Sequence, residues 1–318
     1  MKCERFETYM SDVNITIFTP TYNRDKYITN LFESLCKQTV LPCEWIIVDQ
    51  GNDGTRDLVQ NFAEKAKFPI IYKRLDGERG IGRALNLMMN IARGDLVMKV
   101  DDDDTLTSFA LEAVIAVEAT IDDKTSYAGV AGLRQYPDGR AIGSEWIHSS
   151  SYIDCTNLER AKYGLNGDKA EAYYLHVLKA YGPIPTVPGE YYTWEGILWD
   201  RIAHAGKKIR WFNQKIYCTE YLPGGATSTR VEARKNNFYT YTILVSERLS
   251  YTEVPLKERV ILSCRYFELL REKEINYKDI KQFFIKSKGI ALMGRMGSML
   301  TKYIPQHTAE YSNYQKGK

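Results

Sequence analysis

The first hundred residues alternate between short apolar runs and longer segments with helical spacing of apolar residues. The apolar runs, rich in Val and Ile, cover residues 14–19, 44–49, 69–75 and 94–100. Between them, apolar residues recur every three or four positions over residues 25–38, 57–67 and 83–92. Alternation of strands with helices predicts a mainly parallel sheet with helices on both faces.

The pattern is looser beyond about residue 125, where tyrosines and prolines are frequent. We expect a helix from Trp194 to His204 and then two strands, over 208–212 and 215–222. Three further helices are predicted over 232–250, 256–274 and 277–304. The chain therefore divides into residues 1–110, residues 111–230 of the same domain, and a helical region, residues 231–318.

Polar residues gather where three of the predicted strands end, at residues 20–23, 49–53 and 101–104. Parallel strands end at one edge of a sheet, which is where α/β proteins bind ligands. The four aspartates at 101–104 offer hard oxygen ligands that suit Mg²⁺ or Mn²⁺. The alternative is a solvated acidic turn in which Asp104 caps the following helix. Convergence of three polar clusters favours one binding site.

Composition and charge exclude several classes of protein. The 318 residues are 44% hydrophobic and 26% charged, as in ordinary globular domains. Six scattered cysteines without a C-x-x-C pair argue against structural zinc and a disulfide framework, and favour the cytoplasm. We find no signal peptide and no run of membrane-spanning length. The net charge of +3, with no uniformly basic face, argues against nucleic-acid binding.

Four motifs resemble the family 2 inverting glycosyltransferases of GT-A fold. They are PTYNRDKYITNLFESLCKQT, WIIVDQGNDGT, GERGIGRALN and ARGDLVMKVDDDDTL. TWEGILWDRIAHAG and YCTEYLPGGATS resemble the acceptor side of bacterial members that build surface polysaccharides. The resemblance implies a GT-A type, Rossmann-like sheet with a C-terminal helical extension. It also implies transfer from a UDP-sugar to a hydroxyl of a glycan or lipid-linked oligosaccharide.

The resemblance assigns roles within the aspartate run (residues 101–104). Asp103 matches the ligand of an Mn²⁺ or Mg²⁺ ion, and Asp101 matches a contact to the ion or the ribose. Asp102 is expected beside the nucleotide-sugar, and a shift of the motif by one residue stays open.

The resemblance also places the nucleotide at the ends of the first two strands. Pro20, Tyr22 and Asn23 lie in the segment that matches the uracil-stacking part of the family. Asp49 matches the carboxylate that accepts a hydrogen bond from the uracil N3–H. For Tyr22 the alternative is ordinary core packing.

Two positions depart from the family. Leu85 stands where an arginine on the phosphate side is usual, so Arg79 or Arg83 is expected to supply that charge; either is alternatively a surface residue. Many members carry a Glu-Asp pair at the start of the acceptor-side helix, with the aspartate as base, and here the pair is Glu195-Gly196.

An inverting transfer needs a carboxylate that takes the proton of the acceptor hydroxyl. Glu195 is the candidate because a helix N-terminus favours its ionised form. The alternative is a glutamate that only stabilises the helix dipole. Glu190 and Asp200 are weaker candidates, and Asp200 is expected to pair with a basic neighbour.

The helical region carries 16 Lys/Arg against 9 Asp/Glu. Four cations recur every seven residues in the last predicted helix: Lys281, Lys288, Arg295 and Lys302. A basic amphipathic helix is typical of peripheral contact with an anionic membrane, here the inner face. The alternative is packing on the catalytic domain or on a second subunit of a homodimer.

Two other functions stay open at this point. A nucleotidylyltransferase shares the α/β sheet and a metal site, but PTYNRD lacks the glycines of its usual signature. A non-catalytic nucleotide-sugar-binding protein is the other alternative, because of Leu85 and Gly196.

Overall fold

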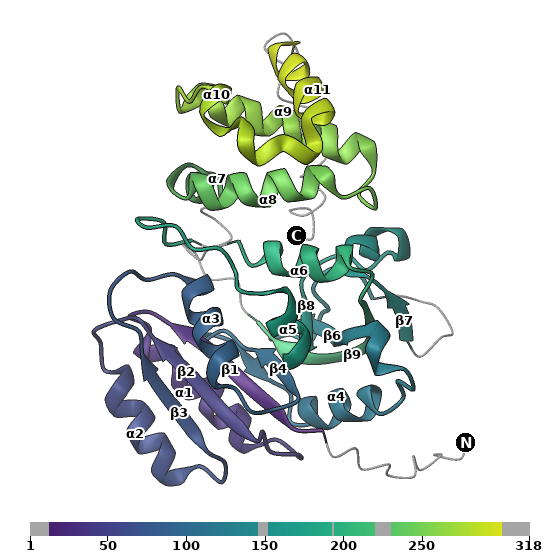
Figure 1. Ribbon diagram of the computed structural model, residues 1–318. Helices are drawn as coiled ribbons and strands as arrows, with labels where there is room; N and C mark the ends of the chain where they lie inside the picture. The colour runs from purple at the N-terminus through teal and green to yellow at the C-terminus, as the bar shows by residue number, and fades with distance from the viewer. Residues whose placement is uncertain (1–12, 146–151, 193, 220–229, 301–318) are drawn as a thin grey trace.

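The computed structural model describes residues 13–145, 152–192, 194–219 and 230–300 (Figure 1). The first half contains β1 (Ile15–Thr21), α1 (Asp25–Cys36), β2 (Glu44–Asp49), α2 (Thr55–Lys65), β3 (Ile70–Arg74), α3 (Ile81–Ile91), β4 (Leu96–Lys99), β5 (Thr105–Leu106) and α4 (Ala110–Glu118). The elements from β1 to β4 confirm the predicted alternation. Their bounds differ from the predicted ones by at most two residues, because β1, β2 and β4 are buried apolar runs, β3 is a partly buried one, and each helix has one apolar face.

The second half adds η1 (Lys124–Ser126), β6 (Tyr127–Gln135), β7 (Tyr152–Cys155), η2 (Asn157–Tyr163), β8 (Lys169–Tyr174), α5 (Leu175–Tyr181), α6 (Gly196–His204) and β9 (Lys208–Cys218). The sheet order is β3-β2-β1-β4-β8-β6-β9-β5, with β7 paired to β9. Strands β3, β2, β1 and β4 are parallel, whereas β8 runs antiparallel to both β4 and β6. The parallel part therefore belongs mainly to the first half of the chain.

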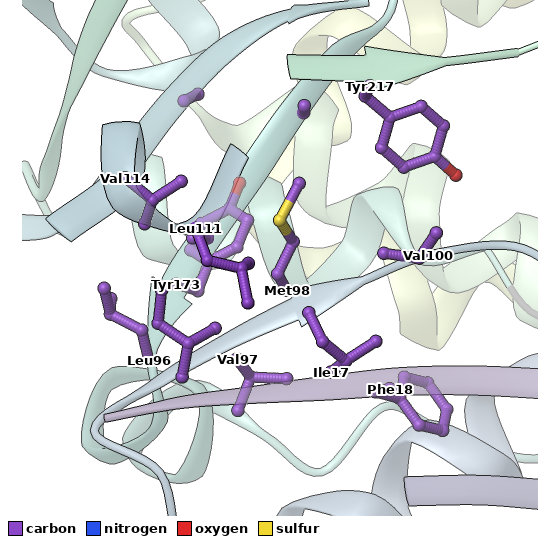
Figure 2. Close-up of a cluster of buried hydrophobic side chains, with 14 of the residues drawn as sticks. Ile17, Phe18, Leu96, Val97, Met98, Val100, Leu111, Val114, Tyr173 and Tyr217 are labelled. Atoms are coloured by element: carbon purple, nitrogen blue, oxygen red, sulfur yellow. The ribbon is translucent and has the colours of Figure 1, made fainter. Parts of the chain in front are cut away.

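Buried apolar side chains fix β1 and β4 against the rest of the sheet. Figure 2 shows Ile17 of β1, Met98 of β4 and Leu111 of α4 in one cluster, and all three are fully buried. The backbone N–H of Val100 donates to the carbonyl of Phe18 over 2.9 Å, so the chain stays beside β1 as it leaves β4. This packing holds the ends of β1 and β4 side by side at one sheet edge.

The two strands predicted over 208–212 and 215–222 are one strand, β9. Its pairing with β6 shifts register at three places, and these irregularities accommodate the polar residues that suggested a break. Residues 220–222 of the prediction lie outside the described residues.

The C-terminal region is more divided than the three predicted helices. It consists of α7 (Arg230–Asn236), α8 (Phe238–Ser250), α9 (Leu256–Glu272), α10 (Tyr277–Ile280), η3 (Lys281–Ser287) and α11 (Lys288–Leu300). The first predicted helix is interrupted at Asn237, whose φ of −125° is not helical and whose side chain bonds to the backbone of Ala233 and Tyr192. The last is interrupted at Phe284, which is buried with φ −103° and ψ 20°. Residues 301–304 of that prediction lie outside the described residues.

A separate cluster of buried side chains holds the helical region together. Its largest members come from α8, α9 and η3 and are Phe238, Tyr241, Tyr266, Phe267 and Phe284. In Figure 1, α7 and α8 lie between the sheet-containing part and the outer helices α9, α10 and α11. No helix in the described part of the chain is long and apolar enough to cross a membrane.

Candidate functional site

The aspartate run leaves β4 with two side chains turned inward and two turned outward. The side chains of Asp102 and Asp104 are 6% and 4% exposed, whereas those of Asp101 and Asp103 are 35% and 23% exposed. This alternation separates the four carboxylates into different environments. The proposed cap at Asp104 is wrong, because the following helix, α4, begins only at Ala110.

The inward carboxylates connect the run to neighbouring strands. Asp102 accepts hydrogen bonds from the Thr21 hydroxyl over 2.7 Å and from Arg24 Nε over 2.8 Å. Asp104 accepts from the hydroxyl of Tyr217 over 2.7 Å and from that of Thr219. Burial raises the pKa of each of these carboxyl groups to about 6, against the opposing effect of the hydrogen bonds.

The outward carboxylates each contact a cation of the chain. Lys99 Nζ lies 2.9 Å from Asp101 Oδ1, and Arg24 Nη2 contacts Asp103 Oδ2. Burial raises the pKa of Asp101, but Lys99 and then Arg134 and Arg24 lower it further, so the carboxyl stays ionised.

The outward pair fits a divalent ion that is bound together with a diphosphate. Within the described residues, no three His, Cys, Asp or Glu side chains are grouped to hold a metal ion by themselves. Mg²⁺ usually takes one or two carboxylates and completes its shell with substrate phosphates and water. Asp101 and Asp103, two positions apart in the sequence, supply two partly exposed carboxylates of this kind.

Glu195 lies directly before α6 and is joined to the aspartate run by Lys99. Lys99 Nζ lies 3.2 Å from Glu195 Oε1 and 3.4 Å from Oε2. Burial lowers the pKa of Lys99, but Asp101 and Glu195 outweigh burial and raise it, so the ammonium group stays charged. Lys99 was not singled out from the sequence, where its only signal is a charged residue at the end of an apolar strand.

The two weaker base candidates have structural partners. Glu190 is 7% exposed and accepts hydrogen bonds from the backbone N–H groups of Tyr239 and Thr240, over 2.6 and 2.8 Å, at the start of α8. Asp200 pairs with Arg248 over 3.0 Å, as expected. Of the three acidic candidates, only Glu195 contacts Lys99, which in turn pairs with Asp101 of the aspartate run.

An arginine lies between two aromatic rings at the end of β1. Tyr22 is 43% exposed, so the alternative of core packing is wrong. The Arg79 guanidinium lies 4.4 Å from the centre of the Tyr22 ring and 5.0 Å from that of Tyr191. Arg79 is therefore placed at the edge of the same site, where its charge is available to a ligand.

Arg83 is engaged by the chain itself. Its guanidinium donates to the carbonyls of Glu190 and Val187 over 3.1 and 3.2 Å, and it pairs with Glu78. Glu78 also accepts from the backbone N–H of Gly189 over 2.8 Å. These contacts join the Gly-rich loop (residues 76–82) and the start of α3 to residues 187–190.

The ends of β1 and β2 are joined by their own side chains. Pro20 is a half-buried residue of β1. Asn23, with a positive φ of 52°, accepts from the backbone N–H of Asn52 over 2.7 Å. A Cβ on Gly51 would lie 2.4 Å from the Asn23 nitrogen, so this approach requires glycine. The predicted convergence of the three polar clusters at one sheet edge is confirmed.

Asp49 is enclosed at the end of β2. It is 1% exposed, and its two oxygens accept from the backbone N–H of Gly51 and the hydroxyl of Tyr72, each over 2.7 Å. The next residue, Gln50, is partly exposed and accepts from the backbone N–H of Gly80 in the Gly-rich loop. Gln50 was not singled out from the sequence.

Comparison with known proteins bears on this site. The model of the family described as "Glycosyl transferase family 2" matches residues 16–157, which include β1, β4 and the aspartate run. This match covers less than half of the chain and shows that this segment is similar to the family. The chain is 32% identical over 147 residues to "Uncharacterized glycosyltransferase YwdF" of Bacillus subtilis (strain 168), covering 45% of this chain and 53% of that protein.

A second relative in Bacillus subtilis (strain 168) is "Putative teichuronic acid biosynthesis glycosyltransferase TuaG". It is 30% identical over 136 residues, or 42% of this chain and 52% of that protein. The chain thus spans about half the length of these two curated relatives.

The structure of S. aureus TarS 1–349 superposes with a TM-score of 0.57 at 20% identity, covering 91% of this chain and 80% of that one. The same protein in complex with UDP-GlcNAc gives a TM-score of 0.54 at 18% identity, covering 95% and 78%. These likenesses confirm the predicted mixed α/β fold, in which helices flank a central sheet, and they are consistent with the GT-A type.

Proposed function

We propose that the protein transfers a sugar from a UDP-sugar to a hydroxyl of a glycan or lipid-linked acceptor, with inversion, in the synthesis of a cell-wall polysaccharide. The observation that carries this proposal is the line of contacts from Asp101 through Lys99 to Glu195. It sets a candidate base beside the carboxylates expected to hold the leaving group.

The donor side of the proposal uses residues of both strand ends. Asp101 and Asp103 would hold an Mn²⁺ or Mg²⁺ ion; such an ion neutralises charge on a departing diphosphate. Arg24 and Lys99 contact the same carboxylates and keep positive charge beside the phosphates. Arg79, rather than the engaged Arg83, is the better placed substitute for the missing phosphate-side arginine.

The base-binding part is proposed around Tyr22. Its exposed ring, with Pro20 and Asn23 beside it, offers a surface on which a nucleobase stacks. Asp49 is enclosed, so we propose that it orders the end of β2 while the partly exposed Gln50 presents its amide to the base. This proposal changes the expectation from the sequence, in which Asp49 itself contacts the uracil.

On the acceptor side, Glu195 would take the proton of the attacking hydroxyl. Its position before α6 places the positive end of the helix dipole at the carboxylate. Lys99 Nζ adds a full positive charge 3.2 Å from Glu195 Oε1.

The test measures UDP release from a panel of UDP-sugars with Mn²⁺, for wild-type protein and for Glu195→Gln. Loss of a general base typically slows a reaction by about 10²–10⁴-fold. Glu195→Gln should therefore lose transfer while UDP affinity, measured by calorimetry, stays within about twofold. Glu253→Gln is the matched control, because Glu253 is exposed against His204 at the other end of α6.

Two results would contradict the proposal. Transfer by Glu195→Gln at the wild-type rate would remove the assigned base. UDP binding by the wild-type protein without UDP release from any donor, with acceptor present, would instead indicate a non-catalytic binding protein.

A further inference from the structure

Helix α11 turns its small residues toward α9 and its large apolar residues outward. A Cβ on Gly294 would lie 1.9 Å from Ser263 Oγ, and one on Gly297 would lie 2.7 Å from Cys264 Sγ. Ser298 on the same side is fully buried and accepts from Arg271 over 2.7 Å. Close contact through glycine and serine leaves no room on this side for leucine or methionine.

The outward side of α11 is an exposed apolar stripe. Leu292, Met296 and Met299 are 58%, 60% and 54% exposed and follow one another at spacings of four and three. This spacing places them on one face of the helix. Met293 at 43% and Ile285 of η3 at 64% extend the same exposed surface. We call these five residues the α11 stripe.

Cations border the α11 stripe. Lys288 and Arg295 are exposed, lie seven residues apart and therefore share one side of the helix next to Leu292. Lys281 and Lys286 of η3 are exposed as well. Residues 280–309 contain no Asp or Glu. The surface thus combines flexible apolar side chains with four cations that form no ion pair within the part of the chain that the structure describes.

We propose that the α11 stripe is a docking surface for an anionic lipid bilayer. A helix with an apolar face bordered by cations lies in the membrane interface, with its apolar side chains inserted and its cations at the anionic headgroups. A second copy of the chain is disfavoured as the occupant. Two-fold pairing of the stripe would bring the cations of two copies together with no carboxylates between them.

The position of the stripe suits this role without depending on the proposed transfer reaction. Figure 1 shows α9 and α11 at the end of the molecule away from the sheet, with α7 and α8 in between. Docking through α11 therefore leaves the ends of β1 and β4 uncovered.

The experiment is co-flotation of the full chain with vesicles. One set contains phosphatidylcholine alone and the other also contains phosphatidylglycerol. Wild-type protein should float only with the anionic vesicles, and added salt should weaken that binding because headgroup attraction is screened.

Two variants separate the apolar and ionic contributions. Leu292→Ser combined with Met296→Ser removes apolar insertion, and Lys288→Glu combined with Arg295→Glu reverses the charge. Each should lower binding at least about tenfold, because insertion and headgroup attraction act together. All four side chains are exposed, so the thermal midpoint should not change.

Matched substitutions far from α11 serve as controls. Val40→Ser with Leu41→Ser replaces two exposed apolar residues of the sheet-containing part, and Lys37→Glu reverses one exposed charge there. Both should bind anionic vesicles as wild type does.

Three results would overturn the proposal. They are wild-type protein that does not float with anionic vesicles, serine variants that bind like wild type, and a wild-type dimer that becomes monomeric on light scattering when Leu292 and Met296 are replaced. The last would identify a second copy as the occupant.

Discussion

Two glycines of α11 should respond in opposite directions to alanine. Gly289 has no atom of the surrounding structure within 4 Å of the position of a Cβ, whereas a Cβ on Gly294 would lie 1.9 Å from Ser263 Oγ and 2.8 Å from the Ser263 carbonyl carbon. Gly289→Ala should stabilise the protein by roughly 0.5–1 kcal/mol, because alanine loses less backbone entropy in a helix. Gly294→Ala has the same entropic benefit, but its added methyl group must push α11 away from α9.

Overpacking of a close contact typically costs about 1–3 kcal/mol, so Gly294→Ala should lose roughly 1–2 kcal/mol after the helix gain. Urea unfolding followed by circular dichroism measures both changes as shifts of the midpoint at constant slope. The reasoning fails if Gly294→Ala is as stable as Gly289→Ala. That result would mean that α11 does not approach α9 through its small residues, and the outward direction of the stripe would lose its basis.

Three further substitutions test other contacts. Lys99→Met should lower the free energy of unfolding by roughly 1.5–3 kcal/mol, the net value of a hydrogen bond to a charged group, and should slow UDP release. Lys99→Arg should retain most of the stability and most of the rate. Equal losses in the two variants would contradict a role for the charge. Glu190→Ala should lower the free energy of unfolding in urea by about 0.5–2 kcal/mol, as the loss of a helix cap does. Its transfer rate should stay within a few-fold of the wild-type rate. Complete loss of transfer would make Glu190 the base. Asp200→Asn should remove a pH dependence of stability. Burial raises the pKa of Asp200 to about 6 despite Arg248, so the wild type should lose about 3 kcal/mol of stability relative to Asp200→Asn as the pH rises from about 4 to 6. Thermal melts in which the difference between wild type and variant is the same at both pH values would contradict this.

The first half of the fold was predictable because its signals are local. Strands β1, β2 and β4 are buried apolar runs and β3 is a partly buried one. The carboxyl ends of parallel strands meet by geometry alone. The meeting of Tyr22 with the aspartate run at one sheet edge followed from this. The pairing of β6, β8 and β9 did not, because it joins residues far apart in sequence and tolerates register shifts that no local pattern encodes.

The orientation of individual side chains could not be predicted from the sequence either. Four consecutive aspartates do not reveal which pair faces inward. That choice depends on Tyr217 and Thr219, which β9 brings to Asp104 from more than a hundred residues away. Lys99 and Arg24 were missed for the same reason, since their partners are set by tertiary contacts.

Residues 187–192 are anchored from two directions. Arg83 binds the carbonyls of Val187 and Glu190, while the start of α8 binds the Glu190 carboxylate and Asn237 accepts from the backbone N–H of Tyr192. A shortened chain that ended before Asn237 would keep only the first anchor. Trimming the helical region to obtain a minimal enzyme would therefore loosen the segment that leads to Glu195, and a poorly active fragment would not disqualify the intact chain as a transferase.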